Sequence, residues 1–182
     1  MSRKNRKLKA KKIKLIISDV DGVLTDGSVY IGPDGKEYKQ FHIDDLTGAA
    51  IARLANIDIV LLSGRFSKST LQFSKELQVK DCIQGKLDKI NAYKDILKKY
   101  KLCDEQVVYI GDALIDIPVL EKVGFAVSVA DAKKEVHEVS EYISKVNGGK
   151  GVLRDVILQL LTYAGTLDQI MDVMKQEIYK VS

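Results

Sequence analysis

Short apolar runs recur along the chain, separated by stretches in which apolar residues repeat with helical spacing. The apolar runs are 13–18, 57–63, 107–111 and 125–130, with 141–144 as a short last candidate. Most are rich in Val and Ile and lack a polar alternation, which is typical of strands buried on both faces. The helical repeats between them are 45–55, 67–77, 89–100 and 116–123. This alternation predicts βαβ units and a Rossmann-like three-layer α/β fold with a parallel sheet.

One segment interrupts the alternation, between the first strand and the first helix. The sequence SVYIGPDGKEYKQFHI, residues 28–43, reads as two short strands around the turn GPDG. We expect a β-hairpin that stands over the carboxyl edge of the sheet.

The C-terminal part begins with a glycine-rich break, NGGKG at 147–151, and continues as an apolar helix at 152–161. An amphipathic helix at 166–179 is too apolar for a free tail, so we expect it to pack on its own domain or on a partner chain. The length of 182 residues suits one domain. We therefore divide the chain into a basic flexible tail at 1–12, a domain at 13–165 and a C-terminal helix at 166–182.

The charge of the chain is unevenly distributed. Residues 1–12 carry seven Lys and Arg and no acid, whereas the rest carries 22 Lys and Arg against 25 Asp and Glu, a net charge of −3. The overall charge of +4 therefore comes from the first twelve residues, which we expect to be solvated and frayed. No aromatic residue is interleaved with these charges to stack on bases, so we do not expect a nucleic-acid partner.

Cysteine usage and the lack of targeting signals favour a protein of the cytoplasm. No apolar run approaches the ~20 residues that a membrane span needs, and the basic start is not followed by the apolar stretch of a secretory signal. Cys82 and Cys103 are not in a CxxC motif, so we expect two reduced thiols and no disulfide.

Polar side chains gather where the predicted strands end, which is where ligands bind in an open α/β sheet. They are Asp19 and Asp21 after the first strand, Ser63, Gly64 and Arg65 after the second, Asp112 and Asp116 after the strand at 107–111, and Lys86 and Lys89 before or at the start of the helix at 89–100. Clustered carboxylates repel one another unless a cation is present, and hard oxygen ligands in that number suit Mg²⁺. A hydroxyl, a backbone amide and an ammonium suit phosphate oxygens. This ligand chemistry predicts a phosphoryl-transfer site.

Taken singly, none of these motifs is specific. An Asp-x-Asp pair is common in surface loops, Ser-Gly-Arg is an ordinary turn, Asp112 can cap a helix, and a lysine is usually solvated. The order of the four motifs, each at the expected point of a βαβ chain, is what favours a site.

The four motifs together resemble those of the haloacid dehalogenase superfamily of phosphatases. They read DVDGVLTDG, LLSGR, the lysine of QGKLDK, and GDALID. One branch is still more similar, the 3-deoxy-D-manno-octulosonate 8-phosphate (KDO 8-phosphate) phosphatases, through VYIGPDGKEYKQFHIDD, DIPVLEKVGFAVSVADA and NGGKGVLRDV. The resemblance runs from about Ile13 to Leu161. It implies the haloacid dehalogenase fold with a small hairpin flap and no large cap domain.

The resemblance implies a role for each acid. Asp19 would be the nucleophile that forms an aspartyl-phosphate, and Asp21 the general acid and base. Mg²⁺ would be held by Asp19, the Asp21 carbonyl and Asp112. Asp116 would orient the site through hydrogen bonds, while Asp26 would shape the turn into the hairpin.

The remaining motif residues would bind substrate. Ser63, the Gly64 amide and Lys89 would hold the phosphoryl group, and Lys89 is preferred over Lys86 because the lysine of this branch follows an acid. Arg65 suits the carboxylate of a sugar acid. Relatives that act on nine-carbon 2-keto-sugar acid 9-phosphates tend to have an acid at this position.

The implied activity is hydrolysis of KDO 8-phosphate to KDO and phosphate, a step of lipopolysaccharide biosynthesis. The alternative within the same chemistry is a phosphatase for a nine-carbon 9-phosphate, of KDN or N-acylneuraminate. Two alternatives come from other classes. A receiver-like signalling module also gathers acids, a hydroxyl and a lysine around Mg²⁺, but it lacks an acid two residues after its nucleophile. A non-catalytic interaction protein would use the basic tail.

Relatives of this type form tetramers in which neighbouring subunits cover each other's sites. The resemblance therefore implies a homotetramer with the hairpins at the interface. Lys150 and Arg154 would be candidates to reach the substrate there, or else are solvated.

Two positions depart from the branch: Ala113 stands where relatives commonly have a second Asp, and Leu46 where many have Gly. We expect Ala113 to tune the metal site and Leu46 to alter the region near the substrate.

Overall fold

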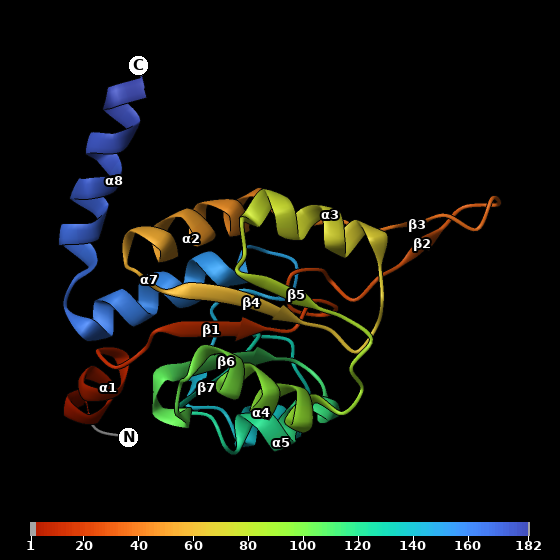
Figure 1. The fold of residues 1–182 in the computed structure, drawn as a ribbon, viewed down its shortest axis with the longest axis horizontal. Helices are drawn as coiled ribbons and strands as arrows, with labels where there is room; N and C mark the ends of the chain where they lie inside the picture. Colours follow the sequence, from red (N-terminus) through yellow and green to blue (C-terminus); the bar gives the residue numbers. More distant parts are fainter. Residues whose placement is uncertain (1–2, 182) are drawn as a thin grey trace.

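A six-stranded parallel sheet forms the centre of this computed structural model, which describes residues 3–181. The strand order is β5-β4-β1-β6-β7-β8 (Figure 1). The strands are β1 (Leu15–Ser18), β4 (Asp58–Leu62), β5 (Asp81–Ile83), β6 (Val107–Gly111), β7 (Phe125–Ser128) and β8 (Tyr142–Ile143). The predicted parallel α/β sheet is confirmed.

Helices cover both faces of the sheet (Figure 1). One layer holds α2 (Ile43–Leu54), α3 (Lys68–Leu77) and α7 (Val152–Ala164), and the other holds α4 (Lys89–Tyr100), α5 (Ile117–Leu120) and α6 (Lys134–Glu138). Ile16 packs in the first layer, whereas Leu15 and Ile17 pack in the second. Because alternate side chains of β1 enter opposite cores, this strand reads as an unbroken apolar run.

The predicted hairpin is present as a separate two-stranded antiparallel sheet. It consists of β2 (Tyr30–Ile31) and β3 (Glu37–Tyr38), with Tyr30 opposite Tyr38. In Figure 1 the hairpin projects beyond the end of the sheet toward which the strand arrows point. It is anchored by the Ser69 hydroxyl, which donates to the Glu37 carbonyl at 3.1 Å.

The expectation of a solvated, frayed tail is wrong for the described part of residues 1–12. Helix α1 (Arg3–Ala10) packs against α7. The Arg6 guanidinium lies 5.5 Å from the centre of the Tyr163 ring, Lys9 pairs with Glu141, and Ala10 is buried. Two of the positive charges of this helix therefore take part in its packing on the domain.

The last helix, α8 (Leu167–Val181), begins against the domain and extends away from it toward the C-terminus (Figure 1). Its first half packs on its own chain, because Leu167, Ile170, Met171 and Met174 contact the core beneath α2 and α7. Two short 3₁₀ turns complete the chain, Asp104–Gln106 and Leu114–Asp116. No helix within the described residues is long and apolar enough to cross a bilayer.

Candidate active site

The carboxyl ends of three neighbouring strands bring most of the predicted site residues together. Asp19 directly follows β1, Ser63 directly follows β4, and Asp112 directly follows β6. Ser18 lies opposite Leu61 in β4 and Ile110 in β6, so these strands end at nearly the same level. A pocket of about 390 Å³ opens there, and Asp21, Gly64 and Arg65 are among its lining residues.

Lys89 occupies the centre of the acidic cluster. It is the first residue of α4, and its ammonium group donates to Oδ2 of Asp19 and, at 2.6 Å, to Oδ1 of Asp116. All three side chains are buried. Burial alone would lower the pKa of Lys89, but the two carboxylates outweigh it and raise the pKa above its usual value. By contrast, Lys86 is exposed.

Asp116 is fully engaged by hydrogen bonds. Besides Lys89, its Oδ1 accepts from the hydroxyl of Tyr109 at 2.6 Å, and its Oδ2 accepts from the backbone amides of Asp112 and Ala113, each at 3.1 Å. Burial raises the pKa of Tyr109 well above its ordinary value, so this phenol remains a donor. With four donors on two oxygens, Asp116 is built to orient Lys89 and the following loop.

Asp112 presents the opposite situation. Its Oδ1 is buried and accepts no hydrogen bond from the residues that the structure describes. Burial, with the nearby carboxylates of Asp19 and Asp116, raises the pKa of Asp112 to about 7. One oxygen from each of the three acids lies within 4.8 Å of the others. Because Asp116 is already saturated, Asp19 and Asp112 are the side chains that can take a metal ion.

Asp19 combines burial with a direct cation. Its Oδ1 accepts from the amide of Val20 at 2.6 Å, and its Oδ2 accepts from Lys89. Burial raises the pKa of Asp19 to about 6, against the opposing effect of Lys89. The carboxylate is therefore mostly ionised at neutral pH while carrying little solvent, which suits a nucleophile.

Asp21 lies at the edge of the pocket and meets the hairpin. Its Oδ1 accepts from the ammonium group of Lys39 at 2.5 Å, whereas its Oδ2 is buried without a hydrogen-bond partner among the described residues. The sequence analysis missed Lys39, because the neighbouring residues of the hairpin are polar and mostly exposed. The available signal was its spacing from Glu37, since residues two apart in a strand share a face.

The loop after β4 is held by Ser63 and Arg65. The Ser63 hydroxyl donates to the Arg65 carbonyl at 2.9 Å and accepts from the Arg65 amide at 3.2 Å. The guanidinium of Arg65 pairs with Glu37 at 2.6 Å. Ser63 must therefore exchange a turn hydrogen bond to reach a phosphate oxygen, and Arg65 must exchange a carboxylate partner to reach a substrate.

The glycine-rich segment at 147–151 packs against the loop that follows Asp21. The amide of Gly149 donates to the Val23 carbonyl at 2.9 Å. A Cβ on Gly148 would collide with the Gly22 carbonyl, and a Cβ on Gly22, at φ +89°, would collide with the Asp112 carboxylate. These close approaches require glycine and fix the shape of the loop.

Other residues singled out in the sequence are not among those that line the pocket. Lys150, Arg154 and Asp26 are exposed, and Asp26 accepts from the Ser28 amide at 2.8 Å, as a residue shaping the turn into the hairpin should. Leu46 packs partly buried against the core at the start of α2.

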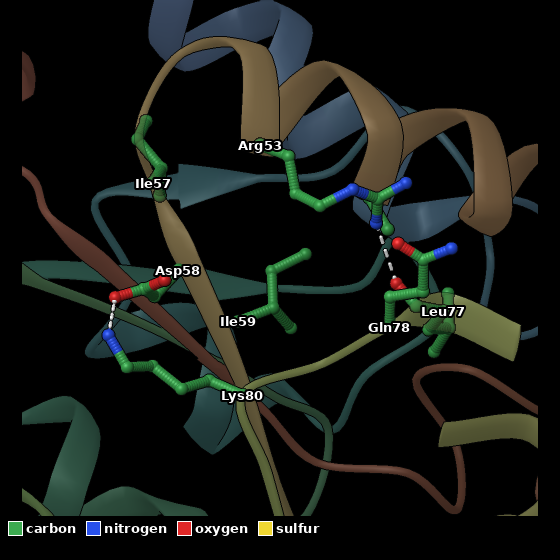
Figure 2. A pocket seen from close by; sticks show the side chains of 8 residues that line it. Arg53, Ile57, Asp58, Ile59, Leu77, Gln78 and Lys80 are labelled. Atoms are coloured by element: carbon green, nitrogen blue, oxygen red, sulfur yellow. Dashed lines mark hydrogen bonds and ion pairs between the residues drawn. The ribbon is translucent and has the colours of Figure 1, made fainter. Parts of the chain in front are cut away.

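A second pocket, at the opposite end of β4, lacks such chemistry (Figure 2). It measures about 170 Å³ and lies beside Ile57, Ile59 and Leu77. Its charged groups already have partners: the guanidinium of Arg53 donates to the Leu77 carbonyl at 2.8 Å, and Lys80 pairs with Asp58. The candidate active site is the acidic edge, because the carboxylates of Asp19 and Asp112 lie near Lys89 there.

Comparison with known proteins decides the family. A model of haloacid dehalogenase-like hydrolases matches residues 81–156. The 3-deoxy-D-manno-octulosonate 8-phosphate phosphatase KdsC of Escherichia coli (strain K12) is 40% identical over 161 residues, which cover 88% of this chain and 86% of that protein. This chain belongs to the KDO 8-phosphate phosphatase family. Its chemistry is that of a phosphatase, which decides against the receiver-like and non-catalytic alternatives.

Solved structures of KDO 8-phosphate phosphatases share the fold. The protein from Moraxella catarrhalis, solved with a magnesium ion, a phosphate ion and KDO, has a TM-score of 0.90 and 32% identity, covering 96% of this chain and 99% of that one. The protein from Yersinia pestis has a TM-score of 0.86 and 36% identity, covering 90% and 89%.

Proposed function

We propose that this chain is a Mg²⁺-dependent phosphatase that hydrolyses KDO 8-phosphate to KDO and phosphate through an aspartyl-phosphate. The observation that carries the proposal is the contact of Asp19 with Lys89 beside Asp112, at the strand edge of a chain 40% identical to KdsC. The relative from Moraxella catarrhalis was solved with magnesium and with phosphate and KDO, which are the two products of this reaction.

Asp19, Asp112 and the Asp21 carbonyl would hold the metal. All the ligands are oxygen atoms, and the buried Oδ1 of Asp112, which has no hydrogen-bond partner among the residues described, is the ligand atom that most needs a cation. Bound Mg²⁺ would withdraw charge from the phosphoryl oxygens and offset the repulsion between the acids.

Asp19 acts as the nucleophile. One of its carboxylate oxygens attacks phosphorus, the bond from phosphorus to the sugar oxygen breaks, and the leaving alkoxide takes a proton from Asp21. Lys89, the Ser63 hydroxyl and the Gly64 amide neutralise the phosphoryl oxygens during transfer. Asp21, now ionised, removes a proton from water, and the hydroxide attacks the aspartyl-phosphate to release phosphate and restore Asp19.

Arg65 would read the carboxylate of the sugar acid. It already binds one carboxylate, that of Glu37 on the hairpin, with half of its side chain exposed. A substrate carboxylate can take the place of Glu37 in the same geometry. The eight-carbon sugar acid is favoured over the nine-carbon alternative, whose phosphatases tend to carry an acid at this position.

We place the enzyme in a homotetramer in the cytoplasm, without nucleic-acid or membrane partners. Large apolar side chains are exposed on the hairpin, on the loop after Arg65 and at the pocket itself, with Ile31 at 71%, Phe66 at 63% and the pocket-lining Leu87 at 72%. Such a patch is typical of an interface, and a neighbouring subunit there would close a site that has no large cap. Both cysteines are free thiols, as the cytoplasm favours.

Phosphate release from a panel of substrates tests the function. We expect Mg²⁺-dependent turnover of KDO 8-phosphate to exceed that of a nine-carbon 2-keto-sugar acid 9-phosphate and of simple sugar phosphates. The Asp19→Asn variant should fold normally and release no phosphate. Equal, poor turnover of both sugar acids would refute the substrate, and full activity of Asp19→Asn would refute the nucleophile. Light scattering during gel filtration, on the wild type and on Ile31→Glu, tests the tetramer.

A further inference from the structure

Lys39 is a buried lysine that connects the hairpin to the active site. It follows β3 directly, and its side chain is 0% exposed. Its ammonium nitrogen lies 2.5 Å from Oδ1 of Asp21, 3.5 Å from the hydroxyl of Thr70 and 3.7 Å from Glu37. A lysine is rarely buried so completely unless its charge is paired.

The backbone around Lys39 is held from both sides. Before it, the Glu37 carbonyl accepts from Ser69 at 3.1 Å, and the Glu37 side chain pairs with Arg65. After it, Phe41 stacks on Phe73 of α3 with ring centres 4.1 Å apart. These contacts fix the base of the hairpin on α3, so the ammonium group of Lys39 is delivered to one place.

Within residues 3–181, only one oxygen of the Asp21 carboxyl group has a hydrogen-bond partner. Oδ1 accepts from Lys39, and Oδ2 is buried with no hydrogen-bond partner among the described residues. A carboxyl group held at one oxygen has a defined rotamer, and its second oxygen stays free to exchange a proton.

We propose that Lys39 is a positioning residue, which holds Oδ1 of Asp21 so that Oδ2 carries the proton to and from the reacting groups. The inference rests on the proposed role of Asp21 as acid and base. Because Lys39 belongs to the hairpin, proton transfer is competent only while the hairpin is seated on α3. The flap is thus part of the catalytic machinery as well as a cover for the substrate.

The test compares two leaving groups in Lys39→Met. A sugar alkoxide needs a proton from Asp21 to leave, whereas p-nitrophenolate leaves without one, and both substrates then need Asp21 to activate water. We expect kcat for KDO 8-phosphate to fall by about tenfold to a hundredfold, with KM within about threefold of the wild type. With p-nitrophenyl phosphate we expect a burst of p-nitrophenolate, close to one per active site, followed by slow turnover.

Lys36→Met is the matched control, since Lys36 lies on the same hairpin, is exposed and pairs with Asp34. It should behave like the wild type with both substrates. Lys39→Arg keeps the charge near Asp21 and should lose less activity than Lys39→Met. This second variant keeps the test valid if the methionine variant is unfolded at the assay temperature.

Two results would overturn the proposal: unchanged kinetics in Lys39→Met, or an equal loss with both substrates and no burst. An inactive Asp21→Asn alongside a normal Lys39→Met would reject the role of Lys39 and leave the proposed function standing. A fully active Asp21→Asn, or a wild type that hydrolyses neither substrate, would reject the proposed function and this inference with it.

Discussion

Asp112 and Asp116 belong to one motif, four residues apart, but their surroundings give them opposite effects on stability. Asp116 satisfies four buried donors, so it stabilises the fold. Asp112 has a buried oxygen that finds no hydrogen-bond partner in the described part of the chain and lies near two other carboxylates, so without a cation it costs stability. A residue that lowers stability in this way is commonly one that the function of the protein requires.

Replacing each of these two acids by asparagine should separate stability from activity. In Asp116→Asn, the new NH₂ group takes the place of an oxygen that accepts hydrogen bonds, so two hydrogen-bond donors face each other. We therefore expect the free energy of unfolding to fall by about 2–4 kcal/mol. In Asp112→Asn, we expect the unfolding free energy without Mg²⁺ to be unchanged or higher, and kcat to fall by at least about a hundredfold. Urea unfolding and thermal unfolding with and without Mg²⁺ measure both. A normal Mg²⁺-induced rise in Tm for Asp112→Asn would contradict the metal assignment.

The glycine-rich segment acts on the active site through its shape. Gly148 lies against the carbonyl of Gly22, in the loop that presents Asp21. We expect Gly148→Ala to lower the free energy of unfolding by roughly 1–3 kcal/mol and to lower kcat as well, since the loop must move. Gly165→Ala is the control, because Gly165 has φ +77° but open space around it. It should lose stability alone, so equal kcat values in the two variants would argue against the packing role.

Helices α2 and α7 are joined by a buried acid, Asp45. Its Oδ1 accepts from the amide of Leu153 at 2.9 Å, its Oδ2 is buried without a partner among the described residues, and burial raises its pKa to about 7. A raised pKa means that the folded state holds the proton more tightly than the unfolded state. The contribution of Asp45 to stability therefore falls as pH rises from about 4 to about 7.

Asp45→Asn should remove this pH dependence, because asparagine keeps the acceptor for Leu153 and carries no charge. We expect it to raise the free energy of unfolding by roughly 1–3 kcal/mol at pH 8 and by little at pH 4.5. Urea unfolding curves at the two pH values measure the difference. An equal change at both would show that packing, and not ionisation, governs the site.

At the scale of the whole molecule, the N-terminal helix and the acidic cluster lie at opposite ends of the sheet. Helix α1 packs near the amino ends of the strands, whereas the acidic cluster lies at their carboxyl ends (Figure 1). Removal of residues 1–10 should therefore lower the free energy of unfolding by about 1–3 kcal/mol, which corresponds to a few degrees in Tm. Turnover of KDO 8-phosphate at 25 °C should not change. A selective loss of kcat in a well-folded truncated protein would contradict this separation.

Much of the architecture could be predicted from the sequence, because apolar runs and turn residues determine the local conformation of the chain. The runs at 13–18 and 107–111 became β1 and β6, and the turn GPDG became the hairpin. The strand β5 and the helix α6 were not predicted, because both are too short for a repeating pattern of apolar residues. Strand β5 has three half-buried residues, and α6 has five residues. The helix α1 was misjudged because its run of charges hides the small buried side.

The chain alone was sufficient to place Asp19, Ser63, Lys89 and Asp112 near one another, because parallel strands must present their carboxyl ends at one edge of the sheet. The sequence did not predict which carboxylate oxygen each hydrogen-bond donor would contact. The contact of Lys89 with Asp116 and the pairing of Lys39 with Asp21 arise when segments far apart in sequence are packed together. The same packing leaves Oδ1 of Asp112 buried with no hydrogen-bond partner in the part of the chain that the structure describes. Local patterns follow from bonded geometry and burial, whereas hydrogen-bond partners and pKa values depend on three-dimensional distances.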